Sequence, residues 1–281
     1  MTKIITFLSF ILILFVSYSN LFGKDLKIIE ERTFSISPGN NLKLDVTSGG
    51  VSITSWDKDQ VYIKILGNEK AEEKIKFRFF NDDSKVELIA KRKGFFSWFS
   101  SGIKLHYEIK VPSKFNINVE TGGGGIYTAN ISGDLNLSTS GGSIKFENVE
   151  GEFDVSTSGG SITGINFKGN LDASTSGGGL NFTGSDSKIK AETSGGSISL
   201  DYSGVNKGIY LSTSGGGIRI ALPEDFNASA KLHTSGGGIS CELTANNARK
   251  ISHTEFIADL NKGGNTLYAE TSGGSISVVK K

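Results

Sequence analysis

One short phrase, Thr-Ser-Gly-Gly, recurs with small changes along the chain, and its spacing constrains the fold more than any other feature. The threonines that begin the phrase are Thr47, Thr121, Thr139, Thr157, Thr175, Thr193, Thr213, Thr234 and Thr271. From Thr121 to Thr193 the copies are 18 residues apart, and the next two follow after 20 and 21 residues. A fixed period near 20 residues is typical of a solenoid, in which each repeat forms one coil and the coils stack.

The apolar residues keep the same register around each threonine. Leu135 and Leu137 precede Thr139, and Ile144 and Phe146 follow it, in alternation with polar residues. This period of two indicates strands with one buried side. The two pairs have opposite parity, and one straight strand cannot bury both because each one-residue step changes the face. The chain must therefore turn between them at Gly-Gly, since glycine permits a positive φ or a close backbone approach.

We therefore predict an all-β fold, a single parallel β-solenoid (a single-stranded parallel β-helix) with coils of 18–21 residues. Each coil would contain a strand, the Gly-Gly corner, a second strand and a looser turn, and the threonines would form an inward or corner ladder. Winding would be right-handed, by analogy with parallel crossovers. A coil cannot fold alone, because ordering its backbone costs about 1–2 kcal/mol per residue, more than its few apolar side chains contribute.

The two ends of the chain depart from this pattern. Residues 24–119 alternate without the 18-residue period, so we expect early coils and an antiparallel hairpin or meander that caps the stack, with 120–281 forming the repeat solenoid of the same domain. The longer interval from Thr234 to Thr271 indicates either one coil with an excursion through residues 246–259 or two coils with one phrase lost. The terminal Lys280 and Lys281 suit the protection of an exposed last strand.

The first residues predict export. Lys3 precedes an apolar run over residues 4–16, and small and polar residues follow, which is the pattern of a secretory signal peptide. We assign residues 1–19 to it, with cleavage after Ser19 or, alternatively, after Gly23. The run is shorter than the ~20 residues of a membrane-spanning helix, although an uncleaved N-terminal anchor remains an alternative. We expect the protein in the periplasm, at the outer membrane, on the cell surface or secreted.

Charge and cysteine usage exclude several classes of function. The chain carries 30 Lys and Arg against 29 Asp and Glu, whereas nucleic-acid binding needs a basic surface. The single cysteine, Cys241, excludes an intrachain disulfide or a cysteine-based metal site, and its position suits a small buried hydrophobe. The glycine phrases contain no Gly-x-x-x-x-Gly-Lys-Ser/Thr motif for phosphate. We predict no cofactor and no metal.

The pattern resembles a known bacterial family. Residues 109–115 (Ile-Lys-Val-Pro-Ser-Lys-Phe), followed by a glycine-rich corner and Thr-Ser-Gly-Gly coils, resemble the "putative adhesin" β-strand-repeat family, which is similar to head-GIN domains. Residues 53–57 and 61–63 also look like that family's N-terminal coil. The resemblance covers nearly all of the chain after residue 23. It implies a parallel β-solenoid of unknown function in an exported protein and supplies no catalytic residues.

Acidic residues at outward positions raise two further possibilities. Asp134, Glu152, Asp154 and Asp172 would approach one another on neighbouring coils. A weak calcium site would use them, but a solvated strand face is the favoured interpretation, because amides and lysines stand among them. β-Helices also host polysaccharide-cleaving enzymes, which need paired acids. Clustered carboxylates on one face of the solenoid would favour that alternative, while the sequence itself nominates no catalytic residue.

Serines follow the threonine in successive coils. Stacked coils would align the hydroxyls of Ser140, Ser158, Ser176 and Ser194 in a row with a step of about 4.8 Å. Such a row could bind a glycan or a repetitive surface. Serine beside glycine more often forms a hydrogen bond within its own turn, so the sequence favours a structural role while leaving a binding role open.

The segment from Lys91 to Gly102 is the one region that does not repeat. It contains four aromatic residues behind three cations: Phe95, Phe96, Trp98 and Phe99. One interpretation is a loop that folds over the open end of the solenoid and closes the core. The other is an exposed tip at residues 94–102 that contacts a membrane surface or a partner, because tryptophan suits interfaces and cations suit anionic lipid.

The sequence thus predicts an exported, non-catalytic binding or scaffold module of adhesin type, acting at the cell envelope or surface. Its partners would be a glycan or an envelope protein, with peripheral membrane contact as a further option and no nucleic acid. The alternatives are a carbohydrate-active enzyme on the same scaffold and an envelope structural protein that docks through residues 94–102.

Overall fold

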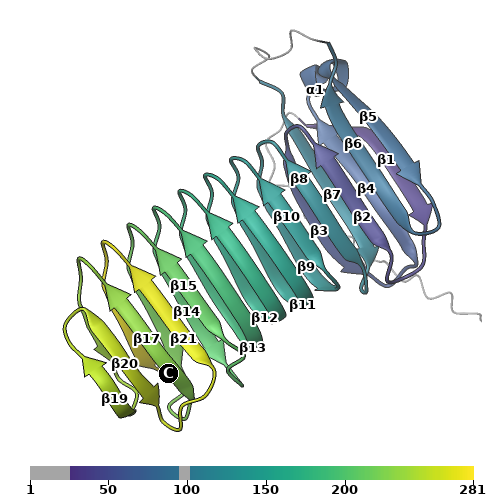
Figure 1. Cartoon of the computed structure of the whole chain (residues 1–281). Coiled ribbons are helices and arrows are strands. Elements are labelled where there is room, and N and C mark those ends of the chain that lie inside the picture. The colour runs from purple at the N-terminus through teal and green to yellow at the C-terminus, as the bar shows by residue number, and fades with distance from the viewer. Residues whose placement is uncertain (1–25, 95–101) are drawn as a thin grey trace, which may run out of the picture.

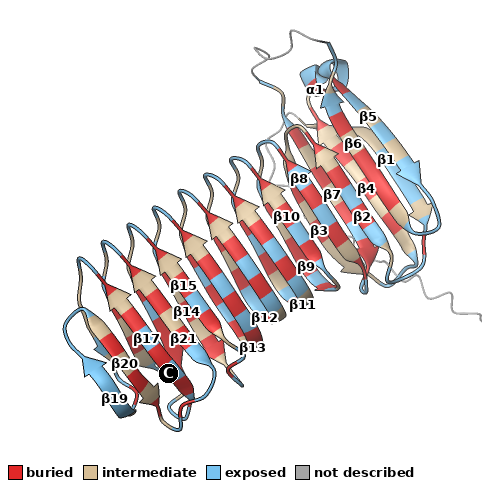
Figure 2. Ribbon diagram, viewed as in Figure 1, coloured by how far each residue is buried: buried red, intermediate tan, exposed pale blue. Residues whose placement is uncertain are grey.

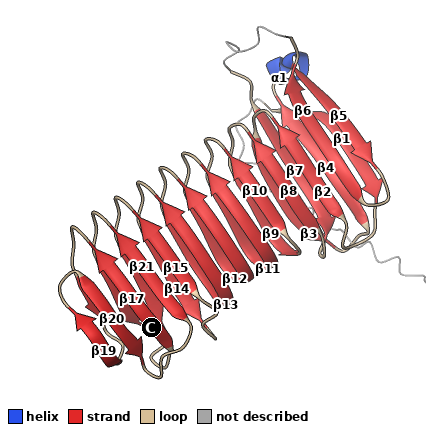
Figure 3. Ribbon diagram, viewed as in Figure 1, coloured by secondary structure: helices blue, strands red, loops and turns tan. Residues whose placement is uncertain are grey.

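The computed structural model describes residues 26–94 and 102–281 (Figure 1). The predicted signal peptide, residues 1–19, and the aromatic residues Phe95, Phe96, Trp98 and Phe99 lie outside the described residues. The described chain is all-β, with a single short helix near its N-terminal end (Figure 3). Strands stack side by side into a long open array, which confirms the predicted β-solenoid.

The middle of the array is a regular parallel stack. Its strands are β8 (Asn116–Thr121), β9 (Ile126–Ser132), β10 (Leu135–Thr139), β11 (Ile144–Thr157), β12 (Ile162–Thr175), β13 (Leu180–Thr193), β14 (Ile198–Ser203), β15 (Ile209–Thr213) and β16 (Ile218–Leu222). Equivalent residues of neighbouring coils pair directly, so that Thr139 lies beside Thr157 and Thr157 beside Thr175. The 18-residue period therefore corresponds to one coil.

The Thr-Ser-Gly-Gly phrase forms the predicted corner, and its threonine ties adjacent coils together. The buried Thr157 hydroxyl donates to the Gly142 carbonyl of the preceding coil at 2.8 Å and accepts from the Gly160 N–H at 3.3 Å. Thr139, Thr175 and Thr193 make the equivalent pair of bonds. The threonines thus form the expected ladder, in which each hydroxyl satisfies polar groups of two coils.

Close approach, rather than a positive φ, explains the second glycine of the phrase in the central coils. A Cβ on Gly160 would lie 2.0 Å from the Gly142 oxygen, whereas a Cβ on Gly159 would meet nothing nearer than 3.6 Å. Neither glycine has a φ in the left-handed region. A second column, Gly151 and Gly169, does have positive φ and stacks equally closely at another corner.

The core fills the space between the two strand layers, because alternate residues are buried along most of the strands (Figure 2). In the central coils an aromatic cluster forms from Phe146, Phe153, Phe167 and Phe182, with ring centroids 5.7–6.4 Å apart. Gly164 makes room for it, since a Cβ there would lie 2.4 Å from the Phe146 ring.

One inward position carries an unpaired hydroxyl. Thr128 is fully buried between Ile53 and Phe146 of the neighbouring coils, and its hydroxyl has no hydrogen-bond partner among the described residues. A buried hydroxyl without a partner costs about 1–3 kcal/mol. We therefore expect Thr128→Val, which keeps the shape, to raise the free energy of unfolding by about 1 kcal/mol, as measured from urea midpoints.

The matched control for this substitution is Thr139→Val. That change removes two hydrogen bonds and leaves the Gly124 carbonyl unpaired, so it should lower stability by about 1–3 kcal/mol. Equal effects of the two substitutions would contradict the assignment.

The N-terminal end is capped by antiparallel strands, as predicted. Its elements are β1 (Lys27–Ser35), β2 (Asn41–Val46), β3 (Gly50–Trp56), β4 (Gln60–Gly67), α1 (Glu69–Lys74), β5 (Ile75–Asn81), β6 (Lys85–Arg92) and β7 (Leu105–Pro112). β5 pairs antiparallel with β6, and β4 pairs antiparallel with both β1 and β7. The coil of β2 and β3 does not lie at the outside. It is inserted between the coil of β6 and β7 and the coil of β8 and β9.

The C-terminal end repeats this insertion. Its strands are β17 (Ala228–Thr234), β18 (Ile239–Cys241), β19 (Ala245–Ile251), β20 (Glu255–Leu260), β21 (Thr266–Thr271) and β22 (Ile276–Lys280). Of the two alternatives for the long interval, the structure has the excursion, since β19 and β20 form an antiparallel hairpin and β20 also pairs antiparallel with β17. The chain then returns, and β21 lies between β15 and β17 while β22 lies between β16 and β18.

The expectation of an exposed last strand was therefore wrong. β22 is an internal strand with a parallel neighbour on each side. Lys280 and Lys281 form ion pairs with Glu224 and Asp201. The lysines thus bind the end of the chain to other segments through ion pairs, and they do not protect an exposed strand edge. Cys241 is half-buried against the core, close to the predicted role.

Candidate binding groove on the sheet face

The predicted serine row exists as a column of exposed corner residues. Ser140, Ser158, Ser176 and Ser194 are exposed, and their hydroxyls have no hydrogen-bond partner among residues 26–94 and 102–281. The second serine of the phrase forms a hydrogen bond to the next coil: the Ser143 hydroxyl oxygen accepts from the Ser161 N–H at 3.2 Å. The hydrogen bond within its own turn that the sequence favoured for the first serine is not formed among the described residues, and the row is free to contact solvent.

The residues on either side of the aromatic segment are described. On one side, the Lys93 N–H donates to the Lys74 carbonyl at 2.7 Å. On the other, the Gly102 carbonyl accepts from the Asn68 side chain at 2.7 Å. Both flanks are therefore attached beside α1, at the N-terminal end of the array. A membrane-spanning helix is not found in residues 26–94 and 102–281.

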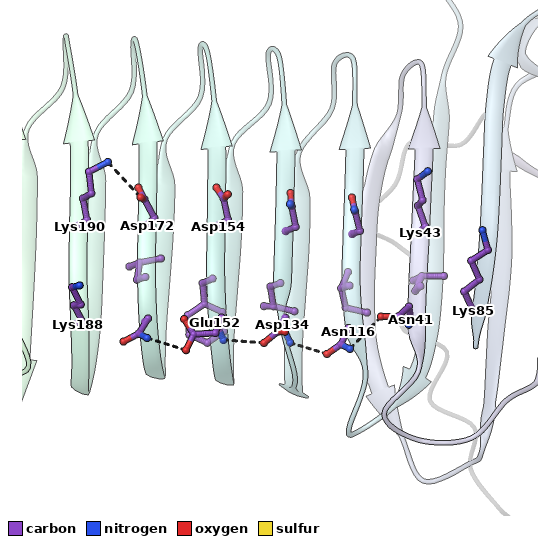
Figure 4. Close-up of a pocket in the computed structure, with 18 of the residues that line it drawn as sticks. Asn41, Lys43, Lys85, Asn116, Asp134, Glu152, Asp154, Asp172, Lys188 and Lys190 are labelled. Atoms are coloured by element: carbon purple, nitrogen blue, oxygen red, sulfur yellow. Dashed lines mark hydrogen bonds and ion pairs between the residues drawn. The ribbon is translucent and has the colours of Figure 1, made fainter. Parts of the chain in front are cut away.

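A long concave feature lies on the outer face of the sheet and crosses the coils (Figure 4). It is an open groove of about 830 Å³ that extends from β6 and β2 through β8, β10, β11 and β12 to β13. Two ranks of outward side chains border it. The first rank is Asn41, Asn116, Asp134, Glu152, Asn170 and Lys188, and the second is Lys43, Asn118, Asn136, Asp154, Asp172 and Lys190.

The ranks follow from the strand period and the parallel register. In the coil that ends at Thr157, Glu152 and Asp154 face outward while Phe153 between them is buried. Each neighbouring coil places residues of the same parity beside them, with Cα partners such as Asp154 and Asp172. The step between coils is about 4.8 Å. Any short polar motif repeated at this position of the phrase becomes a row along the solenoid axis.

Hydrogen bonds connect the first rank from coil to coil. Asn116 Nδ2 donates to Asn41 Oδ1 at 3.2 Å, and the Glu152 N–H donates to Asp134 Oδ1 at 3.4 Å. Asn170 Nδ2 donates to Glu152 Oε1 at 2.9 Å. These bonds hold the side chains in place before any ligand arrives, which lowers the entropy cost of binding.

Charge is unevenly distributed along the groove. Four carboxylates occupy its middle and four ammonium groups its ends: Asp134, Glu152, Asp154 and Asp172 in the middle, Lys43 and Lys85 at one end, and Lys188 and Lys190 at the other. The carboxylates gather as the sequence predicted. In the described part of the chain, no group of three or more His, Cys, Asp or Glu side chains could hold a metal ion.

Three of these four lysines have an acidic partner. Lys43 and Lys85 lie 3.2 and 3.1 Å from the nearly buried Glu87, and the hydrogen bond from Lys85 is the first reason that the Glu87 pKa lies below its usual range. Lys190 lies 3.4 Å from Asp172. Asp134, Glu152 and Asp154 have no cationic partner among the described residues.

The second rank continues past Lys190 into an aromatic pair that the sequence did not reveal. Tyr210 and Tyr268 stack with centroids 4.8 Å apart and planes 3° apart, and the Lys231 ammonium lies 5.8 Å from the centre of the Tyr268 ring. The hydrogen bond to Glu270 raises the pKa of Tyr268 to about 12. The inner ring faces cover each other, so the pair extends the rank without offering an open stacking platform between the rings.

The repeated polar side chains of the groove suit the binding of an extended ligand more than they suit catalysis at a single site. The general acid of a glycosidase typically lies in an apolar environment. The four central carboxylates are exposed to solvent instead. The groove presents amide, carboxylate and ammonium groups in successive coils, which can form hydrogen bonds to a polymer that crosses the strands.

Comparisons with known proteins give one family and several distant structures. A family model described as Toastrack DUF4097 matches residues 39–279. No curated protein matches the chain. A solved "putative cell adhesion protein" from Clostridium sporogenes is 16% identical over 91% of this chain and 100% of its own, with a TM-score of 0.28. Two solved structures come from Parabacteroides distasonis. A "putative lipid binding protein" is 14% identical in sequence with a TM-score of 0.48, and a "putative adhesin" is 12% identical with a TM-score of 0.41. Each match covers 91% of this chain and 97% of the other chain.

Proposed function

The chain belongs to the Toastrack DUF4097 family, and from this premise we propose that it is an exported, non-catalytic binding module of adhesin type whose ligand lies in the groove. The observation that carries the proposal is the pair of polar ranks, which run in register across consecutive coils of a rigid sheet. We propose that the described residues form one domain, with residues 120–281 as its repeat solenoid.

The repetition itself supports an extended partner. Each coil offers the same few polar groups, and a partner with its own repeat can contact several coils at once. Linked contacts that are weak singly give a much tighter overall association, provided that the spacing allows them to form together. The exposed hydroxyl row of Ser140, Ser158, Ser176 and Ser194 lies at the corner of the same coils and would extend the contact surface.

Protease treatment of intact cells, followed by fractionation, tests the location that this function requires. For a surface module we expect degradation of the protein on whole cells, with cytoplasmic and periplasmic marker proteins left intact. Complete protection on whole cells, with degradation only after the outer membrane is opened, would move the function to the periplasm. The same fractionation with Phe95, Phe96, Trp98 and Phe99 replaced by Ser tests the alternative of docking through residues 94–102.

One observation favours a second candidate, a carbohydrate-active enzyme. Asp134, Glu152, Asp154 and Asp172 gather on one face, and pairs of carboxylates cleave glycosidic bonds in many enzymes. Release of new reducing ends from a polysaccharide, abolished by Glu152→Gln, would establish this activity. Binding without any such release over hours would support the non-catalytic proposal.

A further inference from the structure

The middle of the groove carries negative charge that the protein does not neutralise. Asp134, Glu152 and Asp154 come from two adjacent coils, and none has a cationic partner among the described residues. Asp172 of the next coil shares Lys190 with Glu192 in exposed ion pairs, and such pairs contribute little free energy. Three successive coils therefore each present at least one carboxylate to the groove.

These carboxylates lie on both sides of the groove. Asp134 and Glu152 belong to the first rank, and Asp154 and Asp172 belong to the second (Figure 4). Asn116 and Asn118 precede them on one side, and Asn170 follows in the first rank. The lysines are confined to the two ends. A ligand in the groove would thus meet acidic groups to its left and right over the central coils, and cations only where the groove ends.

We propose that this groove binds a linear glycan with free amino groups, whose chain lies along the solenoid axis. This inference rests on the proposed function and adds the class of ligand. Charge complementarity selects the amines, because an anionic polymer would place its charges beside carboxylates that have no other counter-ion. Carboxylates on both sides of the groove can contact the amino groups of a sugar chain whose successive residues turn their substituents to alternate sides.

A glycan fits the remaining chemistry better than a peptide does. The amide and carboxylate groups of Asn116, Asn118, Asn170 and Glu152 are the planar donors and acceptors that pair with neighbouring sugar hydroxyls. The groove crosses the strands on a flat sheet face, so it offers no strand edge to which a peptide backbone could add. Its ligand contacts therefore come from side chains at each coil.

The test compares two probes of equal length, a glucosamine oligosaccharide and its fully N-acetylated counterpart, by calorimetry with the full-length exported chain in a mildly acidic, low-salt buffer. We expect the amine-bearing probe to bind at least tenfold more tightly, and its affinity to fall as salt rises because salt screens exposed charges. In the variant Asp134→Asn/Glu152→Gln/Asp154→Asn the affinity should fall by tenfold or more. These changes keep the oxygen atoms that accept the ladder bonds.

The matched control removes the same charge from other surfaces, in the variant Asp57→Asn/Glu150→Gln/Asp225→Asn, whose exposed carboxylates do not line the groove. It should bind like the unmodified chain, and thermal unfolding should show both variants folded. Equal affinity for the two probes, or unchanged binding by the groove variant, would overturn the inference. Equally tight binding of an oligolysine of the same charge would overturn it in favour of a basic peptide.

The fate of the proposed function can be separated from that of this inference. If the chain binds isolated envelope material through the groove but binds neither probe, the proposed binding function is supported and the proposal of an amine-bearing glycan is refuted. If it binds neither envelope material nor either probe, both the proposed function and the proposed ligand class are refuted.

Discussion

Removing residues 266–281 should unfold the entire C-terminal third of the solenoid, although these residues form only its last coil in sequence. The coil contributes Leu267, Ile276 and Val278, all fully buried, and their burial is worth about 5 kcal/mol or more. It also provides the partner strands on both sides, since β21 joins β15 to β17 and β22 joins β16 to β18. A total stability of 5–15 kcal/mol is typical of a domain, so this loss is a large fraction of it.

Hydrogen exchange measures the extent of this unfolding. In the truncated chain we expect β17 and β20 to lose their protection together, because the cap they belong to no longer contacts the body, while β11 and β12 remain protected. The control Ser277→Ala changes an outward residue of the same coil and should leave protection unchanged. Retained protection of β17 in the truncated chain would show that the cap stacks directly on β15 and would refute the inserted arrangement as the source of stability.

Two glycines that are adjacent in the sequence should respond very differently to the same substitution. Gly160→Ala places a Cβ 2.0 Å from the Gly142 oxygen and 2.4 Å from the Gly142 carbonyl carbon. Backbone atoms cannot move aside as a flexible side chain can, so the coils must separate at that corner and the core beneath must open. We expect a loss of about 3 kcal/mol or more, the upper range for overpacking.

Gly159→Ala is the matched control for this prediction. Its Cβ would have no contact closer than 3.6 Å, and alanine reduces the entropy of the unfolded chain, so stability should stay within about 1 kcal/mol of the original. Urea unfolding of both variants measures the difference. Similar losses at the two positions would show that the glycines serve backbone conformation, and the close-approach explanation would fail.

The local shape of one coil could be predicted because it depends on short-range patterns. The opposite parity of Leu137 and Ile144 required a corner between them, and the phrase left only Gly-Gly to form it. The order of the coils could not be predicted in the same way. The nine phrases are nearly identical, so each coil can in principle stack on any other, and nothing in the residues around Thr271 distinguishes Thr213 from Thr234 as a neighbour.

The candidate groove was predictable to a similar degree. The outward acids from Asp134 to Asp172 occupy two equivalent positions of the 18-residue period, Asp134 and Glu152 the first and Asp154 and Asp172 the second, so their approach followed from the repeat. Asn41, Lys43 and Lys85 join the same groove only because the coil of β2 is inserted beside β8. The residues in contact are more than 70 positions apart in the sequence, and the 18-residue period does not predict their pairing. Tyr210 and Tyr268 meet through the corresponding insertion at the other end.

The two inserted coils also determine where such a molecule can change in length. The coil of β2 and β3 is held between two coils from later in the sequence, and the coil of β21 and β22 is held between two coils from earlier in it. Adding or deleting a repeat at either place would therefore break pairings on both sides. Between β10 and β13 each coil contacts only its immediate neighbours in sequence. The number of coils can therefore change in the middle of the solenoid but not at its ends. Duplication of an 18-residue unit in the middle would lengthen the groove without disturbing the strand pairing at either end.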